Sequence, residues 1–584
     1  MRSDGLRRRV SVRVVFDDRG NCRPPASPVT PADGGRRIGL CVAVLACAFC
    51  LLGVRLAQVS FFMGDDPALM RMAADKDIRR EVTDRDGRPL IMNATLTGFA
   101  IDGREVWDVE ETLRGVLSVF PGTDHERLRV RLSGHRYAHV TDSISAEERS
   151  ALIALGLPGL RFPETVGRVY PQKDLAAHVA GYTIPGRGGA IGTEAALDAD
   201  GFGAEADGRL RMSIDLVAQQ ILEEELAGAM ETFSAKAGWG VLMDVRTGEV
   251  AALASLPDFN PNRPGDAPAH HWRNRAMADR YELGSAFKPI TVAAALDQGH
   301  VSLSDEFDVS RPIRVGGWAI SDYSRKKPVM TLSEVVQYSS NIGTVQIVQR
   351  LGAEAFEDAL ASLHLTDALE TELPEKQAPS YSKAWRPSEL ASTSYGHGIA
   401  VTPLQLTAAF AAVINGGEYR APTFVAGREV AGERVFSRET SDQMRILLRR
   451  AVTDGTGRNA DVDGFYVIGK TATADKPDVG GYDEENGELV SSFIGAFPGH
   501  DPRYVLLVSI DEPAGTKATY GYATAGYVAA PVFRRVVERA APALGVMPVG
   551  DDVAFDGFLG LRRAEIAELD HQDPLNSLLE EALQ

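Results

Sequence analysis

The segment from Ile38 to Val54 constrains this chain most strongly, because its seventeen residues carry no charged side chain. Arg55 interrupts the apolar run, which then continues to Gly64. About 20 apolar residues span a bilayer, and an arginine near the end of a span can reach the headgroups. A cleaved signal peptide would have a shorter apolar core and a small-residue cleavage site, and a buried core helix would not have arginines on one side only. We therefore expect an uncleaved transmembrane signal anchor at residues 38–60.

Charge is divided unevenly about this segment. Residues 1–37 contain nine Arg and four Asp, whereas the whole chain has 62 Lys and Arg against 80 Asp and Glu, a formal charge of −18. Because positive residues stay on the cytoplasmic side of a span, we expect a cytoplasmic basic tail at 1–37 and a periplasmic remainder. The acidic balance of that remainder argues against a nucleic-acid partner.

The four cysteines are confined to the same part of the chain, at Cys22, Cys41, Cys47 and Cys50. The residues beyond the anchor therefore have neither a disulfide framework nor a cysteine metal site. Apolar residues make up 44% of the chain and charged residues 24%, values typical of packed globular protein, so stability has to come from ordinary cores.

A chain of 584 residues is expected to contain several domains. Beyond the anchor, the pattern of apolar and polar residues changes near residue 236. Residues 61–235 form an irregular, strand-rich region in which Asp86-Gly87 marks a hairpin. Residues 236–541 combine apolar helices with strands, which indicates an α/β or α+β domain of catalytic size. The expected helices are 216–233, 289–299 and 403–417, and the expected strands lie within 238–255, 466–474, 491–499 and 503–513. An acidic tail, 542–584, follows.

One match to a nucleotide-binding pattern has to be excluded. Residues 464–471 fit the P-loop expression GxxxxGK[ST] letter for letter. A P-loop requires a flexible turn between its glycines and a helix after them. Here the intervening residues are aromatic and β-branched, which favours a strand, and the residues that follow Thr471 do not favour a helix. We therefore reject nucleotide binding.

A nucleophile with an adjacent base is indicated at Ser285 and Lys288, which precede an apolar helical run. Residues three apart share one helix face, so the hydroxyl and the amine are expected to meet. Ser285 takes the position of an N-cap, and Pro289 falls in the first helical turn, where its missing N–H costs nothing. The pattern S-x-x-K also occurs at 324–327 and 380–383, in polar loops that we expect to be solvated.

Two further elements accompany this pair. Ser339 and Asn341 form the only S-x-N of the chain, on a helical apolar pattern, and Lys470-Thr471-Ala472-Thr473 lies on an expected strand. In this order the three elements resemble the active site of penicillin-binding serine acyltransferases. The resemblance extends over roughly residues 38–541 through further segments, at 274–289, 395–417 and 455–460, and through the DRDG, RVYP and GTE motifs at 84–87, 168–171 and 192–194. These last three motifs resemble the pedestal of the class B, monofunctional branch.

The resemblance implies a fold and a domain plan. The fold class is α+β and multidomain, with a single N-terminal transmembrane helix. A strand-rich pedestal or dimerisation-like domain at 61–235 would precede a transpeptidase domain at 236–541, an antiparallel sheet flanked by helices. No cofactor and no metal are implied.

The implied reaction is acyl transfer between peptidoglycan stem peptides ending in D-Ala-D-Ala, with β-lactams as inhibitors. Ser285 would attack, and Lys288 would act as the base, with its pKa lowered by burial and by Lys470. Ser339 would relay a proton, and Asn341 would hold Lys288 and the substrate amide. The substrate carboxylate would bind Lys470, Thr471 and Thr473, and the backbone N–H groups of Ser285 and Thr473 would form the oxyanion hole.

The S-x-N form resembles the division-specific (FtsI-type) transpeptidases more than the elongation type. The alternatives are an elongation-type transpeptidase, a non-catalytic division scaffold, and a β-lactamase or penicillin sensor. Implied partners are the membrane, an FtsW-type glycosyltransferase and other division proteins. The chain departs from the family at Ala472, where glycine is usual, and we expect activity to be retained while affinity for bulky β-lactams falls.

Overall fold

The computed structural model describes residues 43–50, 52, 79–184, 186–199, 202, 208–323, 327–476 and 488–550. The chain divides into two units, Met1–Asp77 and Ile78–Gln584, and each is described by itself. In the first unit, residues 43–50 and 52 are helical, and their large apolar side chains, Val44, Leu45, Phe49 and Leu52, are exposed. Among the described residues no helix is both long and apolar enough to cross a bilayer. The rest of the predicted anchor, the basic tail and residues 551–584 of the acidic tail lie outside the described residues.

The second unit begins with a four-stranded sheet whose order is β6-β2-β1-β9. Its strands are β1 (Val82–Thr83), β2 (Pro89–Thr97), β6 (Glu164–Val169) and β9 (Leu210–Arg211). The predicted hairpin joins β1 to β2: the buried Asp84 carboxylate accepts from the N–H groups of Asp86 and Arg88, and Gly87 has φ 87°. A positive φ favours glycine, so this turn follows directly from its sequence.

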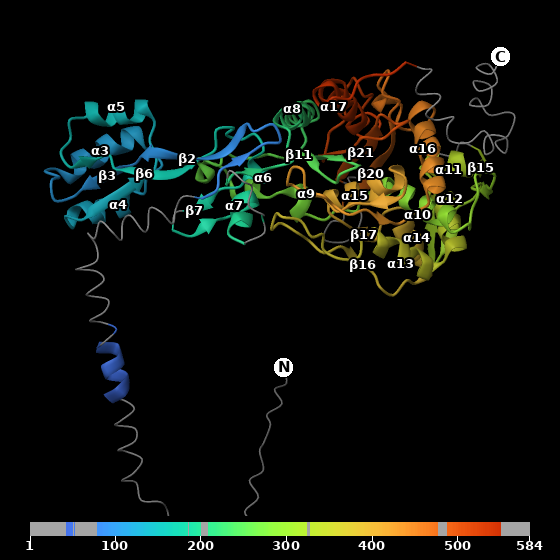
Figure 1. The fold of residues 1–584 in the computed structure, drawn as a ribbon, viewed down its shortest axis with the longest axis horizontal. Helices are drawn as coiled ribbons and strands as arrows, with labels where there is room; N and C mark the ends of the chain where they lie inside the picture. The colour runs from blue at the N-terminus through green and yellow to red at the C-terminus, as the bar shows by residue number, and fades with distance from the viewer. Residues whose placement is uncertain are drawn as a thin grey trace, which may run out of the picture. The chain divides into compact units, whose positions relative to one another are not determined.

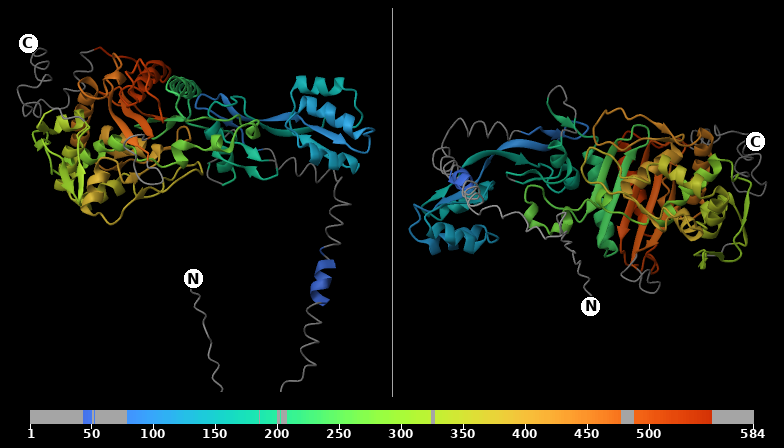
Figure 2. Two further views of the ribbon diagram at one scale, coloured as in Figure 1. Left: turned by 180° about the vertical axis from the view of Figure 1, so that it is seen from behind. Right: turned by 90° about the horizontal axis from the view of Figure 1, so that it is seen from below.

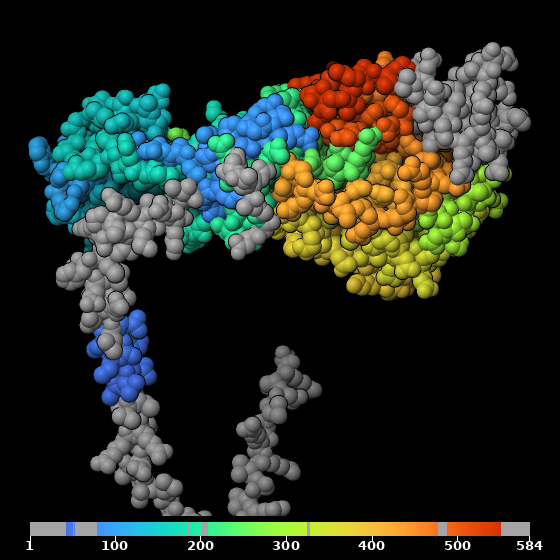
Figure 3. Space-filling view, viewed as in Figure 1, coloured from blue at the N-terminus to red at the C-terminus, as the bar shows by residue number. Residues whose placement is uncertain are grey.

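A head of three helices and three short strands extends from the long β2–β6 ribbon (Figure 1). Its elements are β3 (Phe99–Asp102), α3 (Val109–Val119), α4 (His125–Ser133), β4 (Tyr137–Thr141), α5 (Ala146–Ala154) and β5 (Leu160–Arg161). Their side chains gather in one blue-green lobe in Figure 3. The expectation of a strand-rich region was therefore only partly right. The side chains of Asp108, Asp124 and Ser145 cap these helices, and such caps are a signal that the sequence reading did not use.

The RVYP and GTE motifs meet in a buried ion network. Glu194 is fully buried and accepts from Arg79 at 2.9 Å, from Arg168 at 2.7 Å and from the Tyr170 hydroxyl at 3.0 Å. Removing one partner from such a group leaves an uncompensated buried charge. The network therefore ties the start of the pedestal to α7 (Gly192–Leu197).

A five-stranded antiparallel sheet forms the centre of the larger part of the second unit, which follows α8 (Leu216–Thr232) in the chain. The order of its strands is β11-β10-β22-β21-β20. Its strands are β10 (Ala237–Asp244), β11 (Val250–Leu256), β20 (Ile468–Asp475), β21 (Leu489–Phe497) and β22 (Tyr504–Asp511). The right-hand view of Figure 2 shows the green strands β10 and β11 beside the orange-red strands β20–β22. All the strands predicted for this domain are present.

Helices cover both faces of this sheet. Strand residues such as Leu242 and Val508 pack with α8 (Leu216–Thr232) and α17 (Ala529–Ala543) in one core, whereas their neighbours Val241 and Leu507 pack with α10 (Lys288–Asp297) and α15 (Pro403–Ile414) in another. Because side chains alternate along a strand, one sheet supplies both cores. The helices predicted at 216–233, 289–299 and 403–417 are confirmed as α8, α10 and α15.

The remaining elements surround this framework. They are α6 (Ala177–Ala180), β7 (Thr183–Ile184), β8 (Gly188–Gly189), η1 (Pro264–Asp266), η2 (Ala269–Trp272), α9 (Arg275–Ala278), η3 (Gly284–Ala286), β12 (Glu306–Asp308), β13 (Ile313–Val315), β14 (Trp318–Ile320), β15 (Val329–Thr331), α11 (Leu332–Gln337), α12 (Asn341–Leu351), α13 (Ala353–Ser362), β16 (Ser380–Tyr381), α14 (Pro387–Ser394), β17 (Ile399–Ala400), β18 (Glu418–Tyr419), β19 (Glu433–Arg434), α16 (Arg438–Thr453) and η4 (Arg458–Ala460).

Candidate active site

Ser285 lies in the 3₁₀ turn η3, directly before α10, and its side chain is partly exposed. The helix itself begins at Lys288, and its N-cap residue Phe287 makes no side-chain cap. The expectation that Ser285 is the N-cap was therefore wrong, because the 3₁₀ turn η3 (Gly284–Ala286) separates Ser285 from the first residue of the helix. The Ser285 hydroxyl therefore does not cap the N-terminus of α10.

Lys288 is almost completely buried, and its amine contacts Ser339. Its Nζ donates to Ser339 O at 2.6 Å and to Ser339 Oγ at 3.1 Å. Burial lowers the pKa of Lys288 well below its ordinary value of 10.5, and the charge of Lys470 lowers it further. The structure therefore brings together the predicted S-x-x-K lysine and the predicted S-x-N serine, and it favours a neutral amine.

Ser339 joins α11 to α12 in a left-handed backbone conformation, with φ 61°. A residue with a β-carbon pays of the order of 1–3 kcal/mol for such a conformation, which persists only when its surroundings hold it. In this conformation both the carbonyl oxygen and the hydroxyl of Ser339 accept from Lys288. Strain of this kind is typical of functional sites.

Lys470 lies on strand β20, as predicted, and its side chain is fully buried. Its Nζ donates to Thr471 O at 3.0 Å and contacts Thr471 Oγ1 at 3.5 Å. Burial lowers the pKa of Lys470 to about 7. Two amines that both resist protonation thus lie within electrostatic range of each other.

The other residues of the strand alternate between two environments. The hydroxyls of Thr471 and Thr456 lie 2.5 Å apart, and Thr473 Oγ1 accepts from the N–H of Ala525 at 3.0 Å. Ala472, 2% exposed, packs in the main core with the α10 residues. Its methyl group therefore contributes to the distance between β20 and the core that contains α10.

Asn341 is the first residue of α12, and its Nδ2 donates to Ser321 O at 3.3 Å. The predicted contact of Asn341 with Lys288 is not among the contacts that the structure gives to either residue. Sequence reasoning missed Asp322, which accepts from Ser340 and from the N–H of Ile342. It lies in an aperiodic loop, where spacing carries no signal for its position in space.

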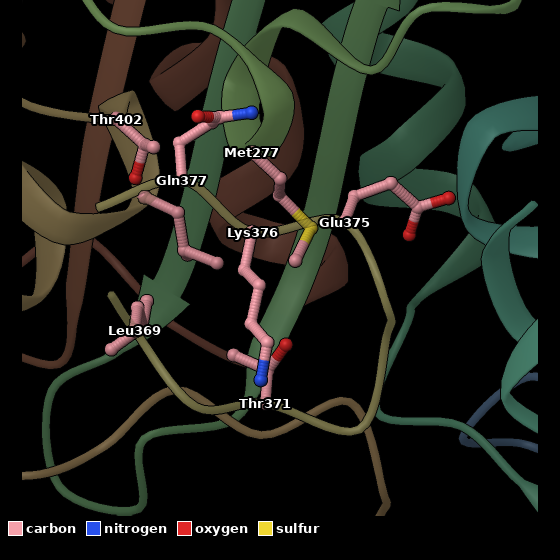
Figure 4. A pocket seen from close by; sticks show the side chains of 8 residues that line it. Met277, Leu369, Thr371, Glu375, Lys376, Gln377 and Thr402 are labelled. Carbon is pink, nitrogen blue, oxygen red and sulfur yellow. The ribbon is translucent and has the colours of Figure 1, made fainter. Parts of the chain in front are cut away.

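The competing motifs behave as expected where they are described. Gly469, Lys470 and Thr471 all continue in strand β20, so the P-loop pattern is not followed by a helix. Ser380 and Lys383 are exposed, and Ser324 lies outside the described residues. A small cavity of about 10 Å³ near Met277 and Leu369, shown in Figure 4, is far too small for a substrate.

Comparison with known families accounts for this arrangement. The family model described as "Penicillin binding protein transpeptidase domain" matches residues 238–538, and the model described as "Penicillin-binding Protein dimerisation domain" matches residues 76–199. The chain belongs to the class B penicillin-binding proteins, of the FtsI type. The predicted resemblance is thereby confirmed.

Individual relatives of this penicillin-binding protein are similar along most of their length. A protein of Caulobacter vibrioides named as a probable peptidoglycan D,D-transpeptidase FtsI is 39% identical over 80% of this chain and 82% of its own length. A probable peptidoglycan D,D-transpeptidase PenA of Neisseria gonorrhoeae is 32% identical over 89% of this chain and 94% of its own. The crystal structure of penicillin-binding protein 3 from Mycobacterium tuberculosis, complexed with aztreonam, matches with a TM-score of 0.63 and 23% identity over 81% of this chain and 97% of that one, which shows the shared fold.

Proposed function

We propose that this penicillin-binding protein is a peptidoglycan D,D-transpeptidase that cross-links stem peptides during septal cell-wall synthesis. The observation that carries the proposal is the buried Lys288 amine, 3.1 Å from Ser339 Oγ and three residues after the partly exposed Ser285. The names of the Caulobacter and Neisseria relatives support the same activity. β-Lactams would acylate the same serine.

In the acylation step, Ser285 Oγ attacks the carbonyl carbon of the penultimate D-alanine. The Oγ–C bond forms, the C–N bond to the terminal D-alanine breaks, and the proton of Ser285 moves to Lys288. Ser339 relays a proton to the leaving amine. An amine of a neighbouring stem peptide then attacks the ester, which releases Ser285.

The remaining residues hold the substrate. Lys470, Thr471 and Thr473 bind the terminal carboxylate, and Asn341 binds the substrate amide. The N–H groups of Ser285 and Thr473 stabilise the oxyanion. The support for this division of roles is that Lys470 and Thr471 share one short segment of β20 whose outer edge is unpaired in the sheet.

We further propose the domain boundaries and the cellular compartment of the protein. The basic tail is 1–37, the single-pass anchor 38–60, the periplasmic pedestal 61–235, the transpeptidase domain 236–541 and the acidic tail 542–584. Exposed apolar side chains on the helix at 43–50 support the anchor in the inner membrane. The anchor and pedestal would meet an FtsW-type glycosyltransferase and other division proteins.

Labelling with fluorescent penicillin tests the enzymatic proposal. We expect one long-lived adduct, mapped by mass spectrometry to Ser285, that is absent in Ser285→Ala and unchanged in the matched control Ser380→Ala. No adduct would leave only a scaffold role, and rapid loss of the adduct would favour a β-lactamase. A fluorescent fusion that follows the side wall rather than the septum would favour the elongation-type alternative.

A further inference from the structure

The loop after β14 is fastened to the S-x-N segment by three hydrogen bonds. Ser340 Oγ donates to Asp322 Oδ2 at 2.7 Å, and the N–H of Ile342 donates to Asp322 Oδ1 at 3.0 Å. Asn341 Nδ2 donates to the carbonyl oxygen of Ser321 at 3.3 Å. Both oxygens of one carboxylate are therefore used on the first turn of α12.

Ser340 links this carboxylate to the helix. It is the N-cap of α12, and its Oγ accepts from the N–H of Gly343 at 2.9 Å. A hydroxyl has a single proton to donate, and here that proton goes to Asp322, so the rotamer of Ser340 is fixed from both sides. The negative charge also lies at the N-terminus of a helix, where it is favourable.

Ser339 directly precedes this clamped residue. On its other side, the N–H of Ser339 donates to Val336 O at 3.3 Å and that of Ser340 donates to Val335 O at 2.9 Å. The left-handed Ser339 is thus held between the end of α11 and the clamp formed by Asp322 and Ser340.

We propose that Asp322 is a positioning residue for acyl transfer, which holds Ser340 and so keeps Ser339 in the conformation that presents its two oxygens to Lys288. The proposal rests on the proposed function, because it assigns Asp322 to the same reaction. Asp322 does not itself contact Lys288 or the nucleophile.

The charge of Asp322 gives the proposal a second, separable readout. The charged groups that act on Lys288 are Lys470 of β20 and Asp322 of the loop. The titratable ring of His397, in the turn at 395–398, also interacts with Lys288, and Glu282 and Asp475 act on that ring in turn. Burial and Lys470 lower the pKa of Lys288, whereas Asp322 opposes them. Removing the charge of Asp322 would therefore lower that pKa further and extend the neutral amine to more acid solution.

The test measures acylation of the full-length protein by fluorescent penicillin as a function of pH. Asp322→Asn is expected to slow the plateau rate by roughly 10-fold to 100-fold, since a small misplacement of a catalytic group has this effect. The acid limb of its pH–rate profile is expected to move to lower pH, because the Asp322 charge no longer raises the pKa of Lys288. Ser340→Ala is expected to slow the plateau rate as well but to leave the acid limb in place, because the carboxylate remains.

Asp308→Asn is the matched control, since the exposed Asp308 of β12 also accepts from a local N–H, that of Ser310. Kinetics of Asp322→Asn equal to those of Asp308→Asn would overturn the proposal, and so would a lowered melting temperature with an unchanged pH profile. If Asp322→Asn does not fold, parental kinetics in Ser340→Ala would overturn it. A parent protein that is not acylated at Ser285 would reject the proposed function, and this inference with it.

Discussion

Replacing Lys470 by methionine is expected to stabilise the protein while it abolishes acylation. The Lys470 side chain is fully buried, and its pKa of about 7 lies below the ordinary 10.5. At about 1.4 kcal/mol per pKa unit, this difference costs the folded state roughly 5 kcal/mol at pH 7 and below. Methionine fills a similar volume without an amine and gives up two hydrogen bonds to Thr471, each of about 1 kcal/mol. The net gain is therefore about 3 kcal/mol.

The sign of the pH dependence follows from the same numbers. The unfolded chain holds the proton of Lys470 up to about pH 10.5, whereas the folded chain loses it above about pH 7. The cost is complete below pH 7, shrinks as the pH rises and vanishes near 10.5. Differential scanning fluorimetry of the full chain in detergent, at about pH 6.5 and about pH 9.5, should therefore show a gain in Tm that is larger at the lower pH.

Lys383→Met is the control for this experiment, because Lys383 is exposed in the S-x-x-K segment at 380–383. It is expected to leave Tm and labelling unchanged. An equal or lower Tm for Lys470→Met than for the parent at both pH values would refute the reasoning, and so would a gain that grows with pH.

Three further outcomes are expected. Glu194→Gln should lower the free energy of unfolding by about 3–5 kcal/mol, because Arg79 and Arg168 lose a buried partner. The control Asp198→Asn removes a carboxylate that is 43% exposed and should cost about 1 kcal/mol or less. Equal losses for the two variants in chemical denaturation would contradict this reasoning. Burial raises the pKa of Glu223 to about 8, so the contribution of this carboxyl to stability falls as the pH rises from about 4.5 to about 8. The Tm of Glu223→Gln relative to that of the parent should therefore rise over this range, and parallel curves would argue against it. Ala472→Gly should speed acylation by bulky β-lactams more than by small ones, and unchanged acylation rates with every β-lactam would show that idea to be wrong.

The parts of the site that could be predicted from sequence are those in which distance along the chain fixes distance in space. Lys288 opens the predicted helix, and Lys470 and Thr471 are adjacent on one strand, so their placement follows from helix and strand patterns. The meeting of the Ser285 hydroxyl with the Lys288 amine stays a prediction, because Ser285 lies in the 3₁₀ turn before the helix. The strands of the central sheet were predictable for the same reason, because each is a short apolar run between turns.

Other features depended on tertiary contacts. The left-handed conformation of Ser339 is imposed by the elements on either side. Serine as a residue type does not predict such a conformation. Asp322 reaches α12 through a loop without periodicity. The head helices are a different case, since Asp108, Asp124 and Ser145 are ordinary capping residues that a search for helix starts would have found.

The pairing of β10 with β22 has a consequence for the time at which the enzyme becomes active. Asp244 lies opposite Tyr504, so the middle of the central sheet joins one of the earliest segments of the larger part to one of the latest. Contacts between such distant segments form slowly, and the missing strands leave edges open in the meantime. A chain that is synthesised from its N-terminus can complete the pedestal pair β1–β9 first. In contrast, β20 lacks its sheet neighbour, β21, until Phe497 has emerged, and β21 lacks β22 until Asp511 has emerged. Acyl transfer therefore has to await nearly the whole polypeptide, and a truncated product would carry the serine and its lysine without a reactive site.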